Sequence, residues 1–553
     1  MKTRYFVAAV AGALLTLSSC VGDLETTPLN ESDKTSETAY NDTAESYLPG
    51  LAKLYNTMSS EKVSYVTVKD AGASQITRAF FACQEITTDA CKVGWGDDAW
   101  CRAMNTNTWT DAENDAVFGV FFRSIQSISY CNEFLRQTTA EKLDDRGVSP
   151  AAKAVIDQYR AEARVIRAWY YWMAMDVFGA VPFATENDAV GATAPAQAPK
   201  EKIYAYVVSE LEALVADNSA LPAAQSNYPR MDKGAALGLL ARIYLNAETY
   251  SGKPEWDKCK TTCEKIFALG YTLAPTYAEL FRGDNGENLE ARNEFLMAVP
   301  FDTNSQQSNG GTTFLVRGAS AQSDVDANGF LLGVNGAWSG IRIDNSFVEK
   351  FYSPANADVT TGEYSIADKR GQIFYIKDRK SLTIADEDQL YTFLYGWSCF
   401  KFNNIPHDKT QEEYKETAAE ETFTNIDLPI IRLGEIYLIY AEACCRLGQG
   451  ATAQAKMDEL AVRTGVTAMT VPQSWDDAAR DAFCAERARE LLWESCRRTD
   501  LIRYDLYSTS TYLWPFKGNA SAIGQKFDKY KELFAIPASQ IKANPDLKNP
   551  VGY

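Results

Sequence analysis

Apolar residues recur every three or four positions over several long stretches of the chain. Between residues 115 and 137, Val117, Phe121 and Ile125 fall on one side of a helix with about 3.6 residues per turn. The same spacing predicts further helices at residues 151–178, 203–215, 233–248, 256–269, 433–447, 452–463, 475–494 and 497–507. Helices of this length that follow one another closely favour a scaffold of packed helical pairs, as in tetratricopeptide-type repeats.

Two stretches interrupt the helical pattern. Residues 87–114 and 271–428 are rich in Gly, Asn, Asp, Thr and aromatic residues, and the second contains short alternating runs such as EFLMAVPF and GQIFYIKD. This composition predicts irregular structure with short strands. Irregular stretches of such length within a folded protein are usually functional, so we expect the binding site there.

The N-terminus has the pattern of a bacterial lipoprotein signal. Two basic residues precede an apolar run at residues 7–17, which is shorter than the roughly 20 residues that cross a bilayer as a helix. The motif LSSC at residues 17–20 resembles a lipobox, in which cleavage leaves Cys20 as an acylated N-terminus. We therefore predict a signal peptide at residues 1–19 and a lipid anchor on Cys20. The alternative is an ordinary export signal with an incidental cysteine.

Composition indicates a folded, acidic protein. The chain has 553 residues, of which 46% are hydrophobic and 12% aromatic, enough to build a large core. Its formal net charge is −18. Because nucleic-acid phosphates are bound by Lys and Arg, this charge disfavours a nucleic-acid partner, and none is predicted.

Cysteine and histidine usage gives little support for metal or nucleophilic chemistry. Besides Cys20 there are eleven cysteines, an odd number, so at least one stays outside any disulfide within the chain. Cys259 and Cys263 lie four residues apart, but no matching Cys/His pair follows, and structural zinc needs about four such ligands. His407 is the only histidine and has no glycine-rich nucleophile turn near it. We predict buried apolar cysteines, no metal and no cofactor, while a glycosidase carboxylate pair stays open among 73 acidic residues.

Several longer motifs follow one another in a distinctive order. They are EITTDA (85–90), EARVIRAWYYWMAMDVFGAVPF (162–183), ARIYLNAE (241–248), DLPIIRLGEIYLIYAEACCRLGQGATAQAKMDELAVRTGV (427–466), ERARELLWESCRRTDLIRYD (486–505) and FAIPASQIKANPDLKNPVGY (534–553). In content and order they resemble the SusD/RagB family of Bacteroidetes surface lipoproteins. The resemblance covers nearly the whole chain after the signal peptide.

The resemblance implies a fold, a role and a partner. It implies a mostly α fold, in which a tetratricopeptide-like helical-repeat scaffold carries a large irregular region with short strands. It also implies a non-catalytic lipoprotein of the cell outer membrane that captures glycans and delivers oligosaccharides to a SusC-like TonB-dependent transporter. Asp23 and Glu25 after the lipidated cysteine look like the family's surface-export signal. Some members look like peptide-binding partners, so peptide capture stays open beside a surface glycoside hydrolase.

The chain divides accordingly into segments with different expected roles. We predict a signal peptide at 1–19, the lipidated cysteine and a polar tether at 20–47, an N-terminal helical region at 48–270 with a ligand loop at 87–114, an irregular ligand-binding region at 271–428 and a C-terminal helical region at 429–553. The charged residues of the C-terminal motifs are expected to join helices rather than contact ligand, since charges at helical spacing usually do so. They are Arg432, Glu435, Glu442, Glu486, Arg489, Glu490, Arg497 and Asp500.

Sugar recognition needs flat apolar platforms beside a few placed polar groups. A pyranose presents a face of C–H groups to an aromatic ring, while its hydroxyls require amide, carboxylate or guanidinium partners. Both irregular stretches offer such residues, although any one tryptophan could instead fill the core. The predicted ligand-binding residues are the platforms Trp95, Trp100 and Trp338 and the polar partners Asp98, Asn105 and Arg342.

Overall fold

The computed structural model describes residues 39–61, 72–189, 191, 194–328 and 331–553. Cys20 and the predicted signal peptide lie outside the described residues. Residues 39–47 of the predicted tether are described, and they include the short helix η1 (Ala44–Tyr47). Tyr47 is fully buried, and its ring stacks on Tyr40 at a centroid distance of 4.8 Å. Packing against the body of the protein therefore begins before residue 48.

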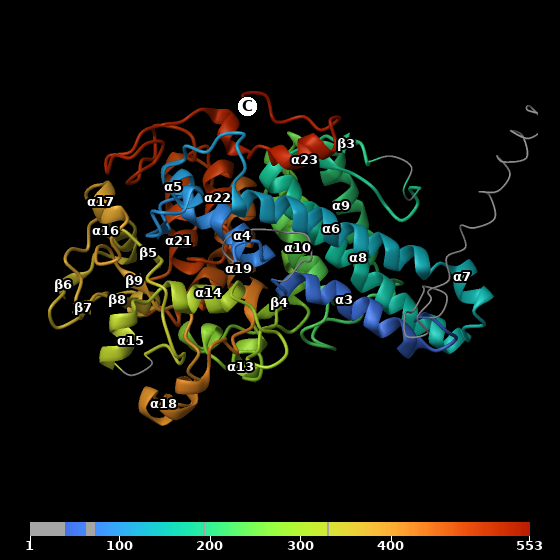
Figure 1. Ribbon diagram of the computed structural model, residues 1–553, viewed down its shortest axis with the longest axis horizontal. Coiled ribbons are helices and arrows are strands. Elements are labelled where there is room, and N and C mark those ends of the chain that lie inside the picture. Colours follow the sequence, from blue (N-terminus) through green and yellow to red (C-terminus); the bar gives the residue numbers. More distant parts are fainter. Residues whose placement is uncertain (1–38, 62–71, 190, 192–193, 329–330) are drawn as a thin grey trace, which may run out of the picture.

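Long helices form the scaffold (Figure 1). In the N-terminal half they are α3 (Leu48–Ser59), α4 (Ile76–Phe81), α6 (Asp115–Gln137), α7 (Ala140–Asp145), α8 (Pro150–Phe178), α9 (Lys200–Leu214), α10 (Lys233–Leu245), α11 (Ala247–Ser251) and α12 (Trp256–Phe267). The C-terminal part adds α19 (Leu433–Arg446), α20 (Gln454–Ala461), α21 (Asp477–Glu490) and α22 (Arg497–Arg503). Neighbouring helices pack in succession, α6 on α8, α8 on α9, α10 on α12 and α12 on α19. The predicted tetratricopeptide-like helical scaffold is confirmed.

Local capping explains where these helices begin and end. Asn114 caps α6 by accepting hydrogen bonds from two backbone N–H groups of the first turn, and Ser149 caps α8 next to a proline at the first helical position. The predicted helix at 233–248 is divided, because the Asn246 side chain donates to the Arg242 carbonyl at 2.9 Å and ends α10. None of the helices in the described part of the chain combines the length and apolar content of a membrane span.

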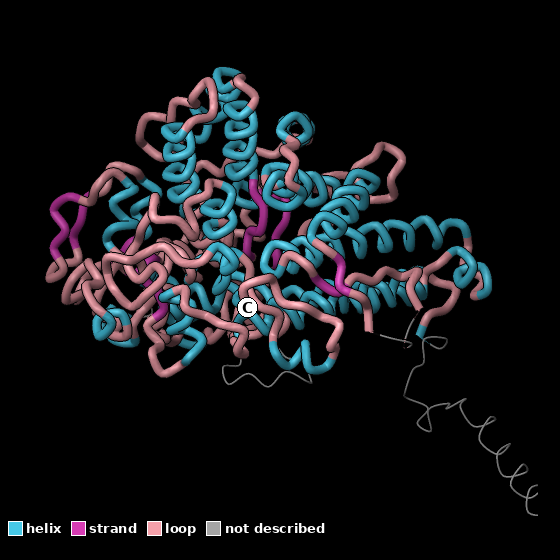
Figure 2. The backbone as a smooth tube through the Cα atoms, turned by 90° about the horizontal axis from the view of Figure 1, so that it is seen from above, coloured by secondary structure: helices cyan, strands magenta, loops and turns pink. Residues whose placement is uncertain are grey.

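The predicted short strands of residues 271–428 are present, among loops and several short helices that the composition did not predict. Throughout the described residues the strands are short and form two-stranded ladders (Figure 2). The strand pairs are β1 (Lys92–Val93) with β5 (Ile341–Arg342), β2 (Val181–Pro182) with β3 (Gln197–Ala198), β4 (Phe295–Val299) with β10 (Leu428–Arg432), β6 (Ala355–Asp358) with β7 (Glu363–Ser365) and β8 (Phe374–Tyr375) with β9 (Ser398–Cys399). The other predicted irregular stretch, residues 87–114, differs from expectation. It contains the helix α5 (Ala99–Thr106), which buries Trp100, Cys101 and Met104.

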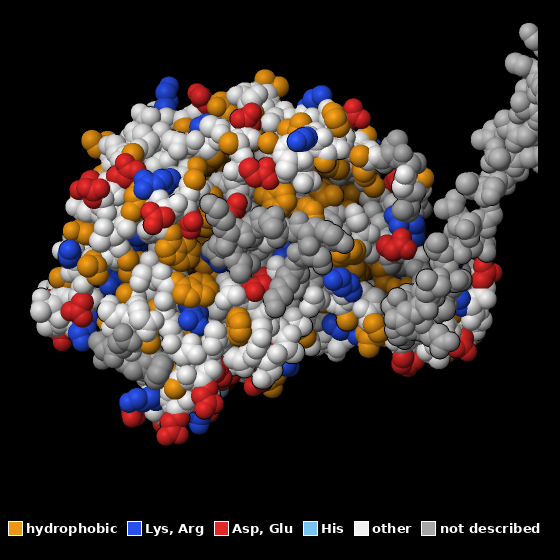
Figure 3. Space-filling view, viewed as in Figure 1, with side chains coloured by type: hydrophobic (Ala, Val, Ile, Leu, Met, Phe, Trp, Pro, Cys, Tyr) orange, Lys and Arg blue, Asp and Glu red, His pale blue; other side chains and the backbone are white. Residues whose placement is uncertain are grey.

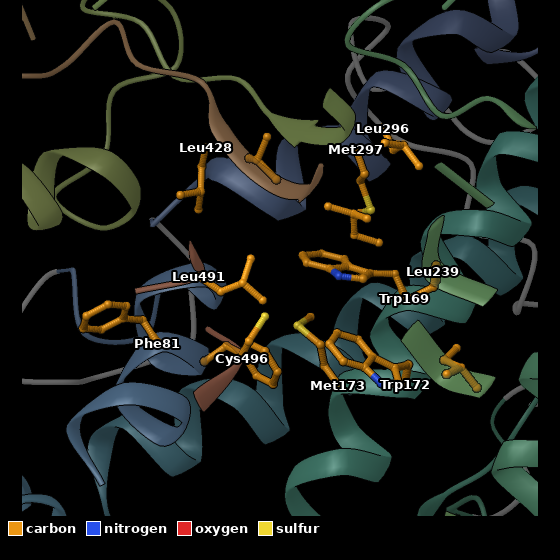
Figure 4. Packing of buried hydrophobic residues seen from close by; sticks show 14 of the residues in the cluster. Phe81, Trp169, Trp172, Met173, Leu239, Leu296, Met297, Leu428, Leu491 and Cys496 are labelled. Atoms are coloured by element: carbon orange, nitrogen blue, oxygen red, sulfur yellow. The ribbon is translucent and has the colours of Figure 1, made fainter. Parts of the chain in front are cut away.

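Apolar residues from distant segments meet in one large core (Figure 4). Trp169, Trp172 and Met173 of α8 face Leu428 of β10 and Phe81 of α4 across it. Burying one such side chain contributes about 1.5–3 kcal/mol. All eleven cysteines of the described residues are buried, which confirms their predicted role as small apolar side chains.

A buried charge network joins the C-terminal helices to β10 and β4. Arg432 donates to Glu294, Glu490 and Glu494 at 2.9, 2.6 and 2.8 Å, and all four side chains are almost completely buried. Nearby, Arg242 forms a two-pronged pair with Glu435. The charged residues of the C-terminal motifs thus hold the scaffold together, and the prediction of a structural role is confirmed.

Candidate functional site

The β1–β5 ladder brings the two predicted ligand segments together. In this antiparallel pair Lys92 lies opposite Arg342 and Val93 opposite Ile341. One residue further along, the Gly94 N–H donates to the Gly340 carbonyl at 2.7 Å. Segments separated by about 250 residues in the sequence therefore form one surface.

Trp95 and Trp338 lie side by side on this surface. The Trp95 Nε1–H donates to the Trp338 carbonyl at 3.0 Å, and both side chains are half-buried. A Cβ atom on Gly340 would lie 2.4 Å from the Trp95 ring, so only glycine lets the ring rest on the backbone there. Hydrophobic side chains gather in patches near the middle of the face in Figure 3. The two indoles supply the flat apolar groups that sugar stacking needs.

Cationic side chains accompany both tryptophans. The guanidinium carbon of Arg78, on α4, lies 5.5 Å from the centre of the Trp95 ring and 4.4 Å from that of Phe314. That of Arg317 lies 5.3 Å from the Trp338 ring. Sequence reasoning missed Arg78 because it lies on α4, outside both predicted ligand stretches. Phe314 and Arg317 lie on α14 (Gly311–Gly318), within the predicted irregular region, but no sequence pattern there links them to the tryptophans. Placed against aromatic faces, the cations stiffen the platform.

Tyr391 adds an aromatic ring that sequence reasoning also missed. It follows α17 (Glu387–Leu390), and its ring lies so close to Gly96 that a Cβ there would approach it to 2.7 Å. Arg102 lies 4.3 Å from the centre of the Tyr391 ring and pairs with Glu387 at 3.0 Å. Both charged partners are about half-exposed, so this ion pair contributes at most about 1 kcal/mol.

Two of the predicted binding residues serve as loop supports in this structure. Asn105 is fully buried; its side-chain oxygen accepts from the Val93 N–H at 3.0 Å and its amide donates to the Val93 carbonyl at 2.8 Å. Arg342 is also buried and donates to the carbonyls of Tyr395 and Gln389 at 2.6 and 2.8 Å. Burial lowers the pKa of Arg342 to about 10. Both side chains fix the loops that carry Trp95 and Trp338, and direct contact with ligand stays a prediction.

The other two predicted residues differ in exposure. Trp100 is 7% exposed and packs into the core beneath α5. Asp98 is half-buried at the N-terminus of α5, where its carbonyl accepts from Cys101. Of the six predicted residues, Trp95, Trp338 and Asp98 thus keep part of their side chains accessible.

The C-terminal motif at residues 486–505 holds the predicted ligand loop at residues 87–114 in place. Arg497 donates to both carboxylate oxygens of Asp89 at 2.8 Å, and Trp493 donates to the Ala90 carbonyl at 3.0 Å. Burial alone would raise the pKa of Asp89, but the adjacent Arg497 lowers it well below its usual range. Strong charge-assisted bonds therefore hold the strand that leads to Trp95.

Glu85, in the π-helical segment η2 (Ala82–Ile86), should make stability depend on pH. Burial raises the pKa of this fully buried carboxyl to about 8, although its Oε1 accepts from the Cys496 N–H at 3.1 Å. The folded state then holds a proton that the unfolded state releases near pH 4.5, so stability falls as pH rises through 8. Between pH 6 and 8 we expect a loss of about 2 kcal/mol from this group, measured by urea denaturation. Glu85→Gln should remove that part of the slope; an unchanged slope would contradict the assignment.

Comparison with protein families agrees with this architecture. Residues 383–553 match the family model described as SusD family, and residues 39–245 match the model described as starch-binding associating with outer membrane. The chain belongs to the SusD/RagB family. This SusD-like protein is 28% identical to the starch-binding protein SusD of Bacteroides thetaiotaomicron, over an alignment that spans 100% of both chains.

Solved structures share the fold of this SusD-like protein. Surface glycan-binding protein A of Bacteroides thetaiotaomicron, in complex with laminarihexaose, superposes with a TM-score of 0.66 at 18% identity, covering 92% of this chain and 99% of the other. A SusD superfamily protein of Parabacteroides distasonis gives 0.65 at 19% identity, covering 94% and 100%. At such identities the likeness establishes the fold, not the ligand.

Proposed function

We propose that this chain is a non-catalytic lipoprotein of the outer-membrane surface that captures oligosaccharides and delivers them to a SusC-like TonB-dependent transporter. The observation that carries the proposal is the pairing of Trp95 and Trp338 by the β1–β5 ladder. Two half-buried indoles with arginines against them form a preorganised platform for sugar rings. The starch-binding relative and the laminarihexaose complex of a structural neighbour support a glycan as the ligand.

The carboxyl groups favour binding over hydrolysis. A glycosidase needs an acid with a raised pKa that faces a second carboxylate across a cleft. Burial raises the pKa of Glu85 to about 8 and that of Asp427 to about 6, but both side chains are enclosed by protein. Glu387, beside the platform, is paired with Arg102. His407 lies in an exposed loop and contacts Asp284 at 2.5 Å.

A polysaccharide screen tests this function. The protein beginning after Cys20 is electrophoresed through affinity gels that contain starch, laminarin, plant polysaccharides or mucin. The protein is also incubated with each of these glycans in solution, and the solution is analysed for released sugars. Retardation without released oligosaccharide is the expected result. Released products would identify a hydrolase, and a folded protein that no glycan retards would favour peptide capture.

Membrane attachment gives a separate prediction for the anchor. Cys20→Ala should move the protein from the outer-membrane fraction to the soluble fraction, because each buried CH₂ of an acyl chain contributes about 0.8 kcal/mol to membrane binding. Cell fractionation with immunoblotting measures the change, and Ser32→Ala, which lies in the predicted tether beyond the lipobox, serves as the control. Membrane retention of the Cys20→Ala variant without acylation would contradict the anchor.

A further inference from the structure

Apart from the tryptophan platform, the protein contains a polar cavity. It has a volume of about 180 Å³ and opens between the loop before α10 and the start of β4. The lining includes Tyr228, Asp232, Tyr271, Arg292 and Asn293, none of which contributes to the platform around Trp95 and Trp338. A hollow of this size is too small for a long glycan and suits a ligand of about one sugar ring.

The loop that forms one wall is tied firmly to the scaffold. Arg230 makes a two-pronged pair with the fully buried Glu162, and the Met231 N–H donates to the Tyr55 hydroxyl at 2.7 Å. The Tyr228 hydroxyl donates to Asp427 at 2.6 Å. Because these bonds join the loop to α8, α3 and the start of β10, the cavity is preformed and needs little ordering to bind a ligand.

Several polar groups that line the cavity have no protein partner. The Arg292 guanidinium lies 5.2 Å from the centre of the Tyr228 ring, and no carboxylate among the described residues pairs with it. Tyr271 is only 8% exposed, yet its hydroxyl makes no hydrogen bond to the described part of the chain. The Asn293 side chain is likewise without a bonded neighbour there. Tyr271 is nearly buried, whereas Arg292 and Asn293 are half-buried, so their side chains stay accessible from the cavity and can bond to a polar ligand.

Asp232 does not neutralise Arg292. Its carboxylate oxygens accept from the backbone N–H groups of Gln225 at 2.7 Å and Ala235 at 3.0 Å, where it caps α10. The cation in the cavity therefore remains available for an external anion, and the planar guanidinium favours a carboxylate.

We propose that this cavity binds a small hydroxylated carboxylate, with Arg292 pairing to the carboxylate and Tyr271 and Asn293 bonding to the hydroxyls. The ring of Tyr228, which already lies against Arg292, borders the space that the ligand carbons would occupy. A uronic acid has this chemistry in a single ring, and an open-chain sugar acid has it without one. The site is independent of glycan capture at the platform.

Saturation-transfer NMR and calorimetry on the soluble protein test the site with D-glucuronate, D-gluconate and D-glucose. We expect glucuronate to bind with a millimolar Kd, since few contacts are made, and glucose, which lacks the carboxylate, to bind at least about tenfold more weakly. Comparable binding of gluconate would show that the site accepts ring and open-chain sugar acids alike, and weaker binding of gluconate would restrict it to ring acids. The absence of binding by both acids would overturn the proposal.

Variants distinguish this cavity from the platform. Arg292→Gln should weaken glucuronate binding roughly tenfold or more, and Tyr271→Phe several-fold, with retardation on polysaccharide gels unchanged. Arg480→Gln, which removes an arginine paired with Asp477 on the surface of α21, is the matched control and should bind as the parent does. Equal glucuronate affinity in Arg292→Gln and the parent, with both proteins folded by circular dichroism, would place the ligand elsewhere and refute the assignment.

Discussion

Replacing Glu490 by alanine is expected to lower the free energy of unfolding by about 3–5 kcal/mol. Its fully buried carboxylate accepts hydrogen bonds from Arg432 at 2.6 Å, Arg463 at 2.7 Å and Arg370 at 2.8 Å. Without the Glu490 carboxylate, too few carboxylates remain to pair with these guanidiniums in a low-dielectric interior. The uncompensated positive charge destabilises the folded state. Urea denaturation of the soluble protein measures the change.

The matched control is the same Glu→Ala substitution at an exposed position. Glu416→Ala alters an exposed residue in the middle of α18 (Gln411–Glu420) and should change stability by less than about 0.5 kcal/mol. Glu490→Gln, which keeps the shape and one acceptor, should fall between the two. If Glu490→Ala is as stable as the parent, the network does not hold the C-terminal helices to β10 and β4.

Trp338→Ala and Trp95→Ala are each expected to weaken glycan binding by about 2 kcal/mol, roughly thirtyfold, once a ligand is found in the screen. Each change removes one stacking surface of the proposed platform, while the β1–β5 ladder depends on backbone groups and survives. The melting temperature should fall little for Trp338→Ala, since its side chain is half-exposed. Affinity gels and calorimetry measure binding, and differential scanning fluorimetry measures stability.

Trp256→Ala provides the matched control for the platform variants. Trp256, at the start of α12, is also half-buried and also has an arginine against its ring, with the guanidinium carbon of Arg446 at 4.4 Å from the ring centre. It should bind glycan as the parent does. A large loss of stability in Trp338→Ala with binding intact would show instead that this tryptophan is a core residue.

Local sequence signals located most of the scaffold. The predicted limits of α6 agree with the structure, and those of α8 differ by one residue, because both helices carry a clear apolar stripe and a capping side chain. The predicted helix at 475–494 is shorter in the structure and ends at Glu490. Trp493 and Ser495 beyond it adopt positive φ angles, which a periodicity of apolar residues does not reveal.

The arrangement of the candidate site was harder to predict from the sequence than the scaffold, because it depends on tertiary structure. Two-residue strands such as β1 and β5 are too short to produce a periodic pattern, so their pairing could not be read from the chain. Asn105 and Arg342 have the polar chemistry of ligand contacts, yet their partners are backbone groups of other segments, which no composition indicates. Arg78 and Phe314 reach the platform from helices.

The sequence by itself therefore determined the helical scaffold, the structural role of the C-terminal charges and the two stretches that carry the candidate site. Those features follow from local periodicity and capping, or from long motifs shared with the SusD/RagB family. Only the tertiary structure decided which tryptophans share a surface and which polar residues are buried supports. Burial and pairing across about 250 residues depend on how the segments pack, and neither is encoded in a local run of residues.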